Sequence, residues 1–370
     1  MTDNNENKVL NVPHLRFPKF SGEWEICKVS ELLDFYSTNS LSWEQLEYGE
    51  KAMMNLHYGL IHVGLPTMVD LRRDKLPNVK EGNMPKNFEL CKEGDVAFAD
   101  ASEDTNEVAK VIELFNLDNK DIVCGLHTIH GRDNKNKTIV GFKGYAFSSS
   151  AFHNQIRRIA QGTKIYSIST KNFSECYVGI PSKAEQTKIA TLLRLIDERI
   201  ATQNKIIEKL QSLIKGLNDN IHKGIKGETV CFSDLGEAYS GLSGKGGDDF
   251  GYGEPFITYM NVYQNTYISE KDYELVQIAP NEKQNSVQYG DALFTLSSET
   301  PEEVGIGAVY LGNTQKLYLN SFCFGIHFYD ERVLPQYLAH FISSSSFRRA
   351  ICPCFSKLGS KNFIFIKSFF

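Results

Sequence analysis

The sequence has no long apolar run, and this absence argues against a membrane protein. No stretch approaches the ~18 uninterrupted apolar residues that a membrane-spanning helix needs. The first ten residues, MTDNNENKVL, are polar and acidic, whereas a secretory signal begins with basic residues followed by an apolar segment. We therefore expect a cytoplasmic protein that does not bind a membrane.

The chain also lacks an excess of basic residues. It has 40 Lys and Arg against 45 Asp and Glu, a net charge of −5, so any surface that binds phosphates must be local. Hydrophobic residues at 41% and aromatic residues at 12% exclude a largely disordered chain. Because 370 residues exceed what one core usually organises, we expect two domains.

Cysteines with metal-binding spacing are missing as well. The eight cysteines are scattered without a Cys-x-x-Cys pair, and only Cys352 and Cys354 lie close together in sequence. His127-x-x-His130 has no third ligand at a useful spacing. The sequence therefore predicts reduced thiols, with no disulfide framework, no metal site and no cofactor.

Catalytic signatures are absent too. Gly244-Lys245 does not belong to a phosphate-binding P-loop, because the upstream glycine would stand at Tyr239, and Gly246 occupies the place of the required Ser or Thr. We find no Asn/Asp-Pro-Pro-Tyr/Phe methyltransferase motif, no glycine-rich cofactor loop and no Gly-x-Ser-x-Gly elbow. We therefore predict no catalytic residues in this chain.

The sequence does contain a long helical pattern that starts at Pro181. Ser182, with Glu185 three residues later, predicts a capping box at the helix start. Steps of four and three residues select positions of which nine in ten are apolar, which is typical of a coiled-coil seam: Ile189, Leu193, Ile196, Ile200, Gln203, Ile207, Leu210, Ile214, Leu217 and Ile221. The alternative is a long helix packed on its own domain.

The segments on either side of this helix resemble each other. GDVAFADASEDTNEV at 94–108 aligns without gaps with GDALFTLSSETPEEV at 290–304, an offset of 196 residues. Identical pairs include Gly94 with Gly290, Asp95 with Asp291, Phe98 with Phe294 and Val108 with Val304. The chain is therefore interpreted as a duplicated domain around a helical rod, an arrangement that suits a DNA site with two spaced halves.

The pattern of short apolar runs predicts the fold class and the domain boundaries. Both flanks have short runs rich in aromatic and β-branched residues, broken by Gly, Asn and Asp, which predicts an α+β fold. We expect two repeated mixed α/β domains joined by a long coiled-coil helix. The expected parts are an N-terminal segment at 1–20, a first domain at 21–180, the spacer helix at 181–226 and a second domain at 227–370.

Local basic clusters are the remaining functional signal. Taken singly, each is more often a solvated face than a binding site, and the duplication is what favours DNA as a common target. The candidate phosphate contacts are Arg72, Arg73, Lys75, Lys135, Lys137, Lys143, Arg157, Arg158 and Lys164 in the first domain, and Lys245, Lys316, Arg348, Arg349 and Lys361 in the second.

The sequence resembles the specificity (S) subunits of type I restriction-modification enzymes. The resemblance is carried by PHLRFPKFSGEWEICKVSELLDF at 13–35, by the repeated Gly-Asp strand with its Ser-Glu turn, and by a Pro-x-x-x-Glu-Gln-x-Lys-Ile helix start at Pro181, Glu185, Gln186, Lys188 and Ile189. It implies two target recognition domains that each read half of a bipartite site in double-stranded DNA. It also implies that the helix docks modification (methyltransferase) subunits, while a restriction subunit carries the nuclease.

The second half departs from this family pattern. Gly359-Ser360-Lys361 is followed by only nine residues, so the second helix of the family is missing. We therefore expect a truncated specificity subunit whose unpaired helix also permits self-association. The alternatives are a silent or phase-variable S cassette without a functional second half, a coiled-coil scaffold for a ligand other than DNA, and an enzyme such as a nuclease.

Overall fold

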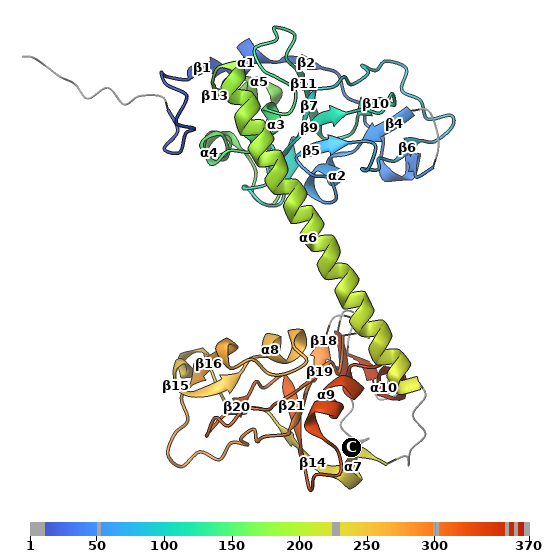
Figure 1. Ribbon diagram of the computed structural model, residues 1–370, viewed down its shortest axis with the longest axis vertical. Helices are drawn as coiled ribbons and strands as arrows, with labels where there is room; N and C mark the ends of the chain where they lie inside the picture. Colours follow the sequence, from blue (N-terminus) through green and yellow to red (C-terminus); the bar gives the residue numbers. More distant parts are fainter. Residues whose placement is uncertain are drawn as a thin grey trace, which may run out of the picture. The chain divides into compact units, whose positions relative to one another are not determined.

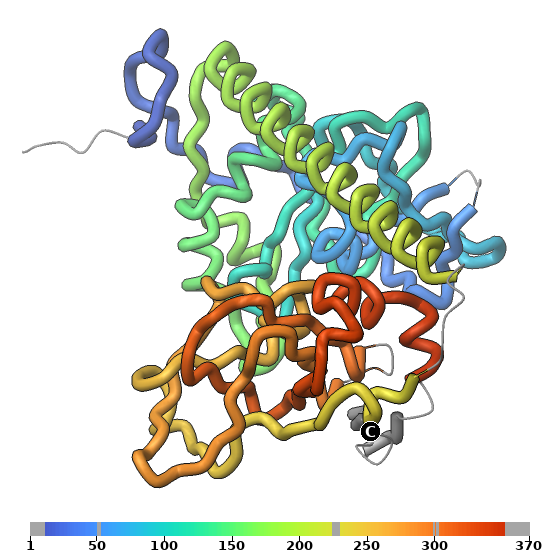
Figure 2. Tube along the Cα trace, turned by 60° about the horizontal axis from the view of Figure 1, so that its bottom comes forward, coloured from blue at the N-terminus to red at the C-terminus, as the bar shows by residue number. Residues whose placement is uncertain are grey.

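The computed structural model describes residues 12–49, 53–223, 230–298, 300, 303–351, 355–358 and 362–365. The chain divides into two compact units, Met1–Gln203 and Asn204–Phe370, and each is described by itself. Figure 1 labels the helices and strands, and Figure 2 follows the chain from the blue N-terminal end to the red C-terminal end.

A five-stranded sheet forms the centre of the first unit. Its order is β2-β11-β7-β9-β5, antiparallel except between β5 and β9. The central strand is apolar on both faces, because Val96 and Phe98 pack into one core cluster while Ala97 and Ala99 pack into another. The strands are β2 (Asp34–Tyr36), β5 (Met68–Asp70), β7 (Val96–Ala99), β9 (Val111–Asn116) and β11 (Thr128–Arg132).

Smaller sheets and short helices complete the first unit. A four-stranded sheet, β10-β4-β6-β3, consists of β3 (Leu46–Glu47), β4 (Met53–Leu56), β6 (Asn78–Val79) and β10 (Asp121–Cys124). Two strand pairs are β1 (Glu25–Lys28) with β13 (Tyr177–Ile180) and β8 (Ala101–Ser102) with β12 (Tyr166–Ser167). The helical segments are α1 (Val29–Leu32), η1 (Trp43–Gln45), α2 (Tyr58–His62), α3 (Lys143–Phe147), α4 (Ser150–Ile159) and α5 (Thr170–Ser174).

The second unit has three sheets. Their orders are β14-β21-β17-β19, β16-β15-β20 and β18-β23-β22. The strands are β14 (Gly236–Ser240), β15 (Phe250–Ile257), β16 (Tyr273–Val276), β17 (Ala292–Thr295), β18 (Ser297–Ser298), β19 (Gly307–Val309), β20 (Tyr318–Leu319), β21 (Cys323–Phe328), β22 (Phe355–Leu358) and β23 (Asn362–Phe365).

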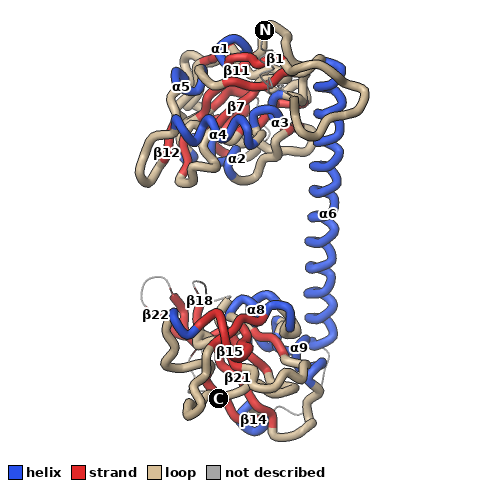
Figure 3. The backbone as a smooth tube through the Cα atoms, turned by 90° about the vertical axis from the view of Figure 1, so that its left-hand side faces the viewer, coloured by secondary structure: helices blue, strands red, loops and turns tan. Residues whose placement is uncertain are grey.

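Short helical segments accompany these sheets, as Figure 3 shows for both units. Leu338 and Ile342 of α9 pack into one core cluster with Phe294 of β17. The segments are α7 (Phe232–Leu235), η2 (Gly247–Asp249), α8 (Tyr259–Gln264), η3 (Glu270–Asp272), α9 (Pro335–Ile342) and α10 (Ser345–Ile351). No helix of the described ranges is both long and apolar enough to cross a bilayer.

The turn before β7 has the same construction as the turn before β17. Gly94 and Gly290 have φ angles of 84° and 89°, a left-handed conformation that favours glycine. The Gly94 amide donates to the carbonyl of Leu114 at 2.7 Å, and the Gly290 amide donates to that of Tyr310 at 2.8 Å. Both pairs keep the offset of 196 residues, so the predicted duplication and the mixed fold are confirmed.

The aspartate that follows the first glycine is a buried acceptor. Asp95 Oδ2 accepts hydrogen bonds from the Lys92 amide at 2.8 Å and from His130 Nε2 at 2.7 Å. The Arg132 guanidinium donates to both carboxylate oxygens, at 2.9 Å and 2.8 Å. Burial raises the pKa of Asp95, but these hydrogen bonds outweigh it and hold the pKa below its usual value.

The second unit repeats this arrangement with different donors. Asp291 Oδ2 accepts from the Gln288 amide at 2.8 Å and from the Tyr239 hydroxyl at 2.7 Å. His327 Nδ1 lies 2.8 Å from Asp291 Oδ1. The position of the carboxylate is therefore the same in both units, while the side chains that satisfy it have changed.

The helix expected over 181–226 is α6 (Lys183–Lys223), and residues 224–229 lie outside the described part of the chain. Ser182 Oγ accepts a hydrogen bond from the Glu185 amide at 3.4 Å, which is half of the predicted capping box. The other half is wrong, because the Glu185 carboxylate is turned to Arg16, with Arg16 Nε and Nη2 at 2.6 and 2.7 Å.

Gln186 fixes α6 to the first unit. Its Oε1 accepts from the Ile139 amide at 2.9 Å, and its Nε2 donates to the carbonyls of Lys137 at 3.1 Å and Pro181 at 2.9 Å. Both Glu185 and Gln186 are fully buried. The Glu-Gln pair of the helix start is therefore an anchor, and two of the segments that carry the family resemblance contact each other through Arg16 and Glu185.

Beyond this anchor the apolar seam of α6 is uncovered. Ile189 and Leu193 are half-buried against the first unit. The apolar seam positions from Ile196 to Ile221 are between 45% and 63% exposed, so within the described residues no element covers them. The end of α6 is part of the second unit, and there Asp219 accepts from the amide and the hydroxyl of Ser345 at 2.8 and 2.6 Å.

We predict that Gln186→Ala destabilises the first unit by about 1–3 kcal/mol. The change leaves the buried carbonyl of Pro181 and the half-buried amide of Ile139 without their partner, and an unsatisfied buried group has a cost of this size. Gln211→Ala is the matched control, because Gln211 is exposed on the same helix. Denaturant unfolding measures both, and equal midpoints for the two variants would contradict the anchoring role.

Candidate nucleic-acid interface

Three predicted contacts lie in one turn after β5. Arg72 Nε donates to Asp70 Oδ1 at 2.9 Å, and this hydrogen bond holds the pKa of Asp70 below its usual value. Arg73 Nε is 3.7 Å from Asp74 Oδ2, and Lys75 is exposed. The structure brings these three cations together, although two of them already face a carboxylate.

Lys135 and Lys137 lie in the loop after β11. Lys135 Nζ donates to the carbonyl of Glu31 at 2.8 Å, and Lys137 Nζ lies 2.6 Å from Glu25 Oε1. The two lysines thus fasten their loop to α1 and β1. The turn that holds Arg72 is a separate element, so the first-unit candidates do not form a single patch.

Lys143 is unsuited to bind phosphate. Its side chain is 4% exposed, and Nζ lies 3.0 Å from Glu113 Oε1 and 3.2 Å from Thr138 Oγ1. Burial raises the pKa of Glu113, while Lys143 and the amides of Gly141 and Gly144 act against this rise. Lys143 is therefore a structural partner of a buried carboxylate, and its inclusion among the phosphate contacts is corrected.

A polar surface surrounds the strand pair β8–β12. We call it the β8–β12 surface. Arg157 Nη1, from α4, donates to Asn106 Oδ1 at 2.8 Å, and both residues line a cavity of about 360 Å³. Arg158 and Lys164 are exposed at the end of α4 and in the loop that follows it. The surface includes Asn106, Lys110, His127, Arg157, Arg158, Gln161, Lys164 and Asn172, and the carboxylates of Asp100 and Glu107 line the same two cavities.

Further polar side chains extend this surface. Gln161, His127 and Asn172 line a second cavity of about 420 Å³. Amide side chains in such positions are the groups that read base edges in a DNA groove. The sequence analysis missed them because Asn and Gln are common, although the place of Asn106 inside the repeated segment 94–108 is a signal that could have selected it.

The second-unit candidates differ in accessibility. The Lys245 side chain is 8% exposed, with Nζ 2.6 Å from Glu282 Oε2, and this hydrogen bond lowers the pKa of Glu282 to about 2. Its amino group is engaged inside the protein, so its prediction as a phosphate contact is corrected. Lys316 is exposed, 3.1 Å from Glu254 Oε1.

The arginine pair of the second unit lies on α10. Arg348 Nη1 donates to the carbonyl of Val304 at 2.6 Å, whereas Arg349 is exposed. Ser344 Oγ accepts from the Phe347 amide at 3.2 Å, which reproduces the N-cap of α4. Measured from this cap, the two arginines stand one turn earlier than Arg157 and Arg158 in α4, so the two pairs are not equivalent. Lys361 lies outside the described residues.

We predict that Lys143→Ala destabilises the protein by about 3–5 kcal/mol at neutral pH, because it leaves the Glu113 carboxylate buried without a cation. Protonation of Glu113 relieves this cost. Since the pKa of Glu113 is raised in the folded state, the loss should be smaller near pH 5 than near pH 8.

Arg158→Ala is the control for this variant, and it should change stability by no more than about 0.5 kcal/mol, because Arg158 is exposed. Denaturant unfolding at the two pH values measures both variants. A pH-independent loss in Lys143→Ala would contradict the assignment.

The sequence of this chain matches known proteins. Residues 74–212 match the type I restriction modification DNA specificity domain. Over 241 residues, 58% of this chain, the sequence is 26% identical to the type I restriction enzyme EcoKI specificity subunit of Escherichia coli K12. The match covers 50% of that protein, so the chain spans about half the length of the curated relative it matches.

Solved structures give a consistent picture. A structure reported under complex assembly and conformational transition of the type I restriction-modification system aligns over 91% of this chain and 83% of its own, with a TM-score of 0.51 and 14% identity. The S subunit from M. genitalium aligns over 94% and 86%, with a TM-score of 0.46 and 15% identity. The former alignment supports a shared fold. Residues 74–212 thus match a type I restriction modification DNA specificity domain, and the chain is similar in sequence to a curated specificity subunit.

Proposed function

We propose that this chain is a DNA sequence-specificity subunit of a type I restriction-modification complex. Each unit would read one half of a bipartite site in double-stranded DNA, and α6 would dock modification (methyltransferase) subunits, which a restriction subunit joins. The observation that carries the proposal is the specificity-domain match, because residues 74–212 include all of the β8–β12 surface and the first three-quarters of α6.

The β8–β12 surface combines the two kinds of group that DNA recognition needs. Arg158 and Lys164 are exposed cations that suit phosphates, and Gln161 offers an amide to base edges. Asn106, whose Nδ2 donates to Asp104 Oδ1 at 3.0 Å, would exchange that hydrogen bond for one to a base. Arg157 links the two kinds of side chain, because its guanidinium donates a hydrogen bond to Asn106. We infer that this surface, rather than the turn at Arg72 or the loop at Lys135, is the main DNA contact of the first unit.

We predict that Arg157→Ala combined with Arg158→Ala weakens binding to duplex DNA of random sequence. Each phosphate contact contributes about 0.9 to the slope of log affinity against log salt, so the slope should fall by about 1.8. Fluorescence anisotropy over a series of salt concentrations measures this slope.

The matched control is Lys205→Ala combined with Lys209→Ala, which removes the same charge from exposed positions of α6. It should leave the slope unchanged. An equal drop in both double variants would mean that only net charge matters. A slope near zero for the unaltered chain would favour the alternative, a scaffold whose ligand is not DNA.

The uncovered seam of α6 supports the docking part of the proposal. The apolar side chains from Ile196 to Ile221 form a continuous stripe along one helix, and a monomeric protein rarely leaves such a stripe in water. We propose that modification subunits cover it, and that a second copy of this chain covers it in their absence.

We predict that Leu210→Glu combined with Ile214→Glu abolishes co-purification with a co-expressed modification subunit. The change places two charges in the seam while glutamate preserves helix propensity. Gln211→Glu, an exposed position between them, is the control and should co-purify normally. Light scattering of the chain alone tests whether a second copy of the chain covers the seam. Undiminished co-purification of the double variant would contradict docking through the seam.

The same proposal assigns the catalytic steps to other subunits. Methyl transfer and cleavage would be performed by the modification and restriction subunits, and this chain would contribute recognition and assembly without catalysis of its own. Such a complex would work on DNA in the cytoplasm. Purified chain that methylates or cuts DNA by itself would overturn this assignment.

A further inference from the structure

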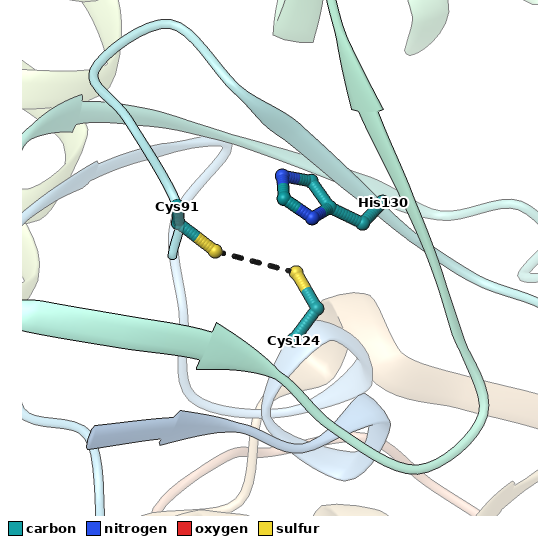
Figure 4. A group of neighbouring side chains, drawn as sticks. All are labelled: Cys91, Cys124 and His130. Carbon is teal, nitrogen blue, oxygen red and sulfur yellow. Dashed lines mark hydrogen bonds between the residues drawn. The ribbon is translucent and has the colours of Figure 1, made fainter. Parts of the chain in front are cut away.

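Three potential metal ligands meet in the core of the first unit. Cys91 Sγ and Cys124 Sγ lie 3.6 Å apart, and the ligand atoms of Cys91, Cys124 and His130 all lie within 4.8 Å of one another. All three residues are buried. Figure 4 shows the two thiols directed toward each other, with the imidazole ring beside them.

The fold brings these residues together from three segments. The Cys91 amide donates to the carbonyl of Ile122 at 2.9 Å, which places Cys91 beside the end of β10. Cys124 is the last residue of β10, and His130 lies in β11. The spacing in sequence is too long between the cysteines for a familiar metal motif, which is why the sequence predicted no metal site.

The hydrogen bonds of His130 fit those of a metal-binding histidine. It is 1% exposed, and its Nδ1 has no hydrogen-bond partner. Its Nε2 lies 2.7 Å from the Asp95 carboxylate. In metal sites a histidine typically binds the ion through one ring nitrogen and a carboxylate through the other. A buried nitrogen with no partner otherwise has a cost of about 1–3 kcal/mol.

The spacing of the two sulfur atoms suits a tetrahedral ion. Two thiolates at ~2.3 Å from a tetrahedral zinc ion lie ~3.8 Å apart, close to the observed 3.6 Å. A disulfide would need the sulfur atoms at ~2.05 Å. The observed distance, which is also that of a thiol–thiol hydrogen bond, excludes a covalent bond and is compatible with an ion between the two sulfur atoms.

The second unit shows that the fold does not require this group. The Val287 amide donates to the carbonyl of Leu317 at 2.7 Å, as Cys91 does to Ile122, so Val287 takes the place of Cys91. In the parallel pair β15–β20, Leu319 lies opposite Ile257, just as Cys124 lies opposite Leu56 in the pair β4–β10.

The second unit also has a different residue at the position of His130. Gly325 pairs with Leu293 in the sheet of the second unit, as His130 pairs with Ala97 in the first. Val287, Leu319 and Gly325 thus replace two thiols and an imidazole at matching positions, and none of the three can bind a metal. The polar group of the first unit is an addition to a fold that forms without it.

We propose that Cys91, Cys124 and His130 bind a thiophilic metal ion of the zinc class, with the two cysteines as thiolates and Nδ1 of His130 as the third ligand. Binding releases the thiol protons to solvent. No fourth His, Cys, Asp or Glu joins the group in the described part of the chain, so these side chains supply three ligands. The ion would clamp β10 and β11, which lie in different sheets, to the segment before β7.

The test is metal binding by the full chain, purified under reducing conditions and freed of metal. Titration with Co²⁺ should produce thiolate-to-cobalt absorption in the near ultraviolet that saturates near one equivalent, and Zn²⁺ should abolish it. Zn²⁺ should also raise the thermal unfolding midpoint of the chain. No absorption and no shift of the midpoint would overturn the proposal.

Variants locate the ion. Cys91→Val, which introduces the residue of the second unit, should abolish the cobalt absorption. Cys176→Val removes another buried thiol of the first unit and is the matched control. Cys352→Ser with Cys354→Ser tests the remaining close pair, and loss of the signal in this variant alone would place the ion there and refute the proposal.

A second variant keeps the test valid if Cys91→Val misfolds. Circular dichroism detects such misfolding. Cys124→Ala removes the other thiol without adding volume and should also abolish the absorption while the chain stays folded. Persistence of the full signal in a folded Cys91→Val or Cys124→Ala chain would contradict the assignment.

Discussion

A buried carboxylate that must be completely hydrogen-bonded is the constraint on which each unit depends. A charged group inside a protein is tolerated only when donors surround it. Asp95 and Asp291 meet this condition through the same backbone turn, which a left-handed glycine makes possible. The donors that come from the neighbouring strand differ, Arg132 in the first unit and His327 in the second. The duplicated motif therefore preserves a position and a charge, while the surrounding core has diverged.

The local parts of this structure could be predicted from sequence because their signals are local. The spacing of apolar residues predicted α6, and the repeated Gly-Asp segment predicted two similar units. The side-chain role of Glu185 could not be predicted, because its partner, Arg16, is 169 residues away in the sequence. A capping box and a long-range ion pair both use a glutamate at this position. The sequence alone therefore does not distinguish the two interactions, whereas the fold does.

The candidate site was harder to predict for a related reason. A lysine in sequence carries no mark of burial, so Lys143 and Lys245 were grouped with exposed cations although each pairs with a carboxylate inside the protein. The group around His130 was missed because its two thiols come from distant segments. Long-range pairing of strands brings together the residues of the buried ion pairs and of the proposed metal site. The spacing of these residues in the sequence does not indicate that pairing.

The central claim is that each unit reads its own part of a DNA sequence. The direct measurement is single-molecule sequencing of methylated DNA from cells that contain this chain and its modification subunit, compared with cells that contain the variant Asn106→Ala with Gln161→Ala. We expect a methylated motif with two specific blocks separated by unread bases, and we expect the variant to alter one block only. A single continuous motif, or a variant that changes both blocks alike, would contradict it.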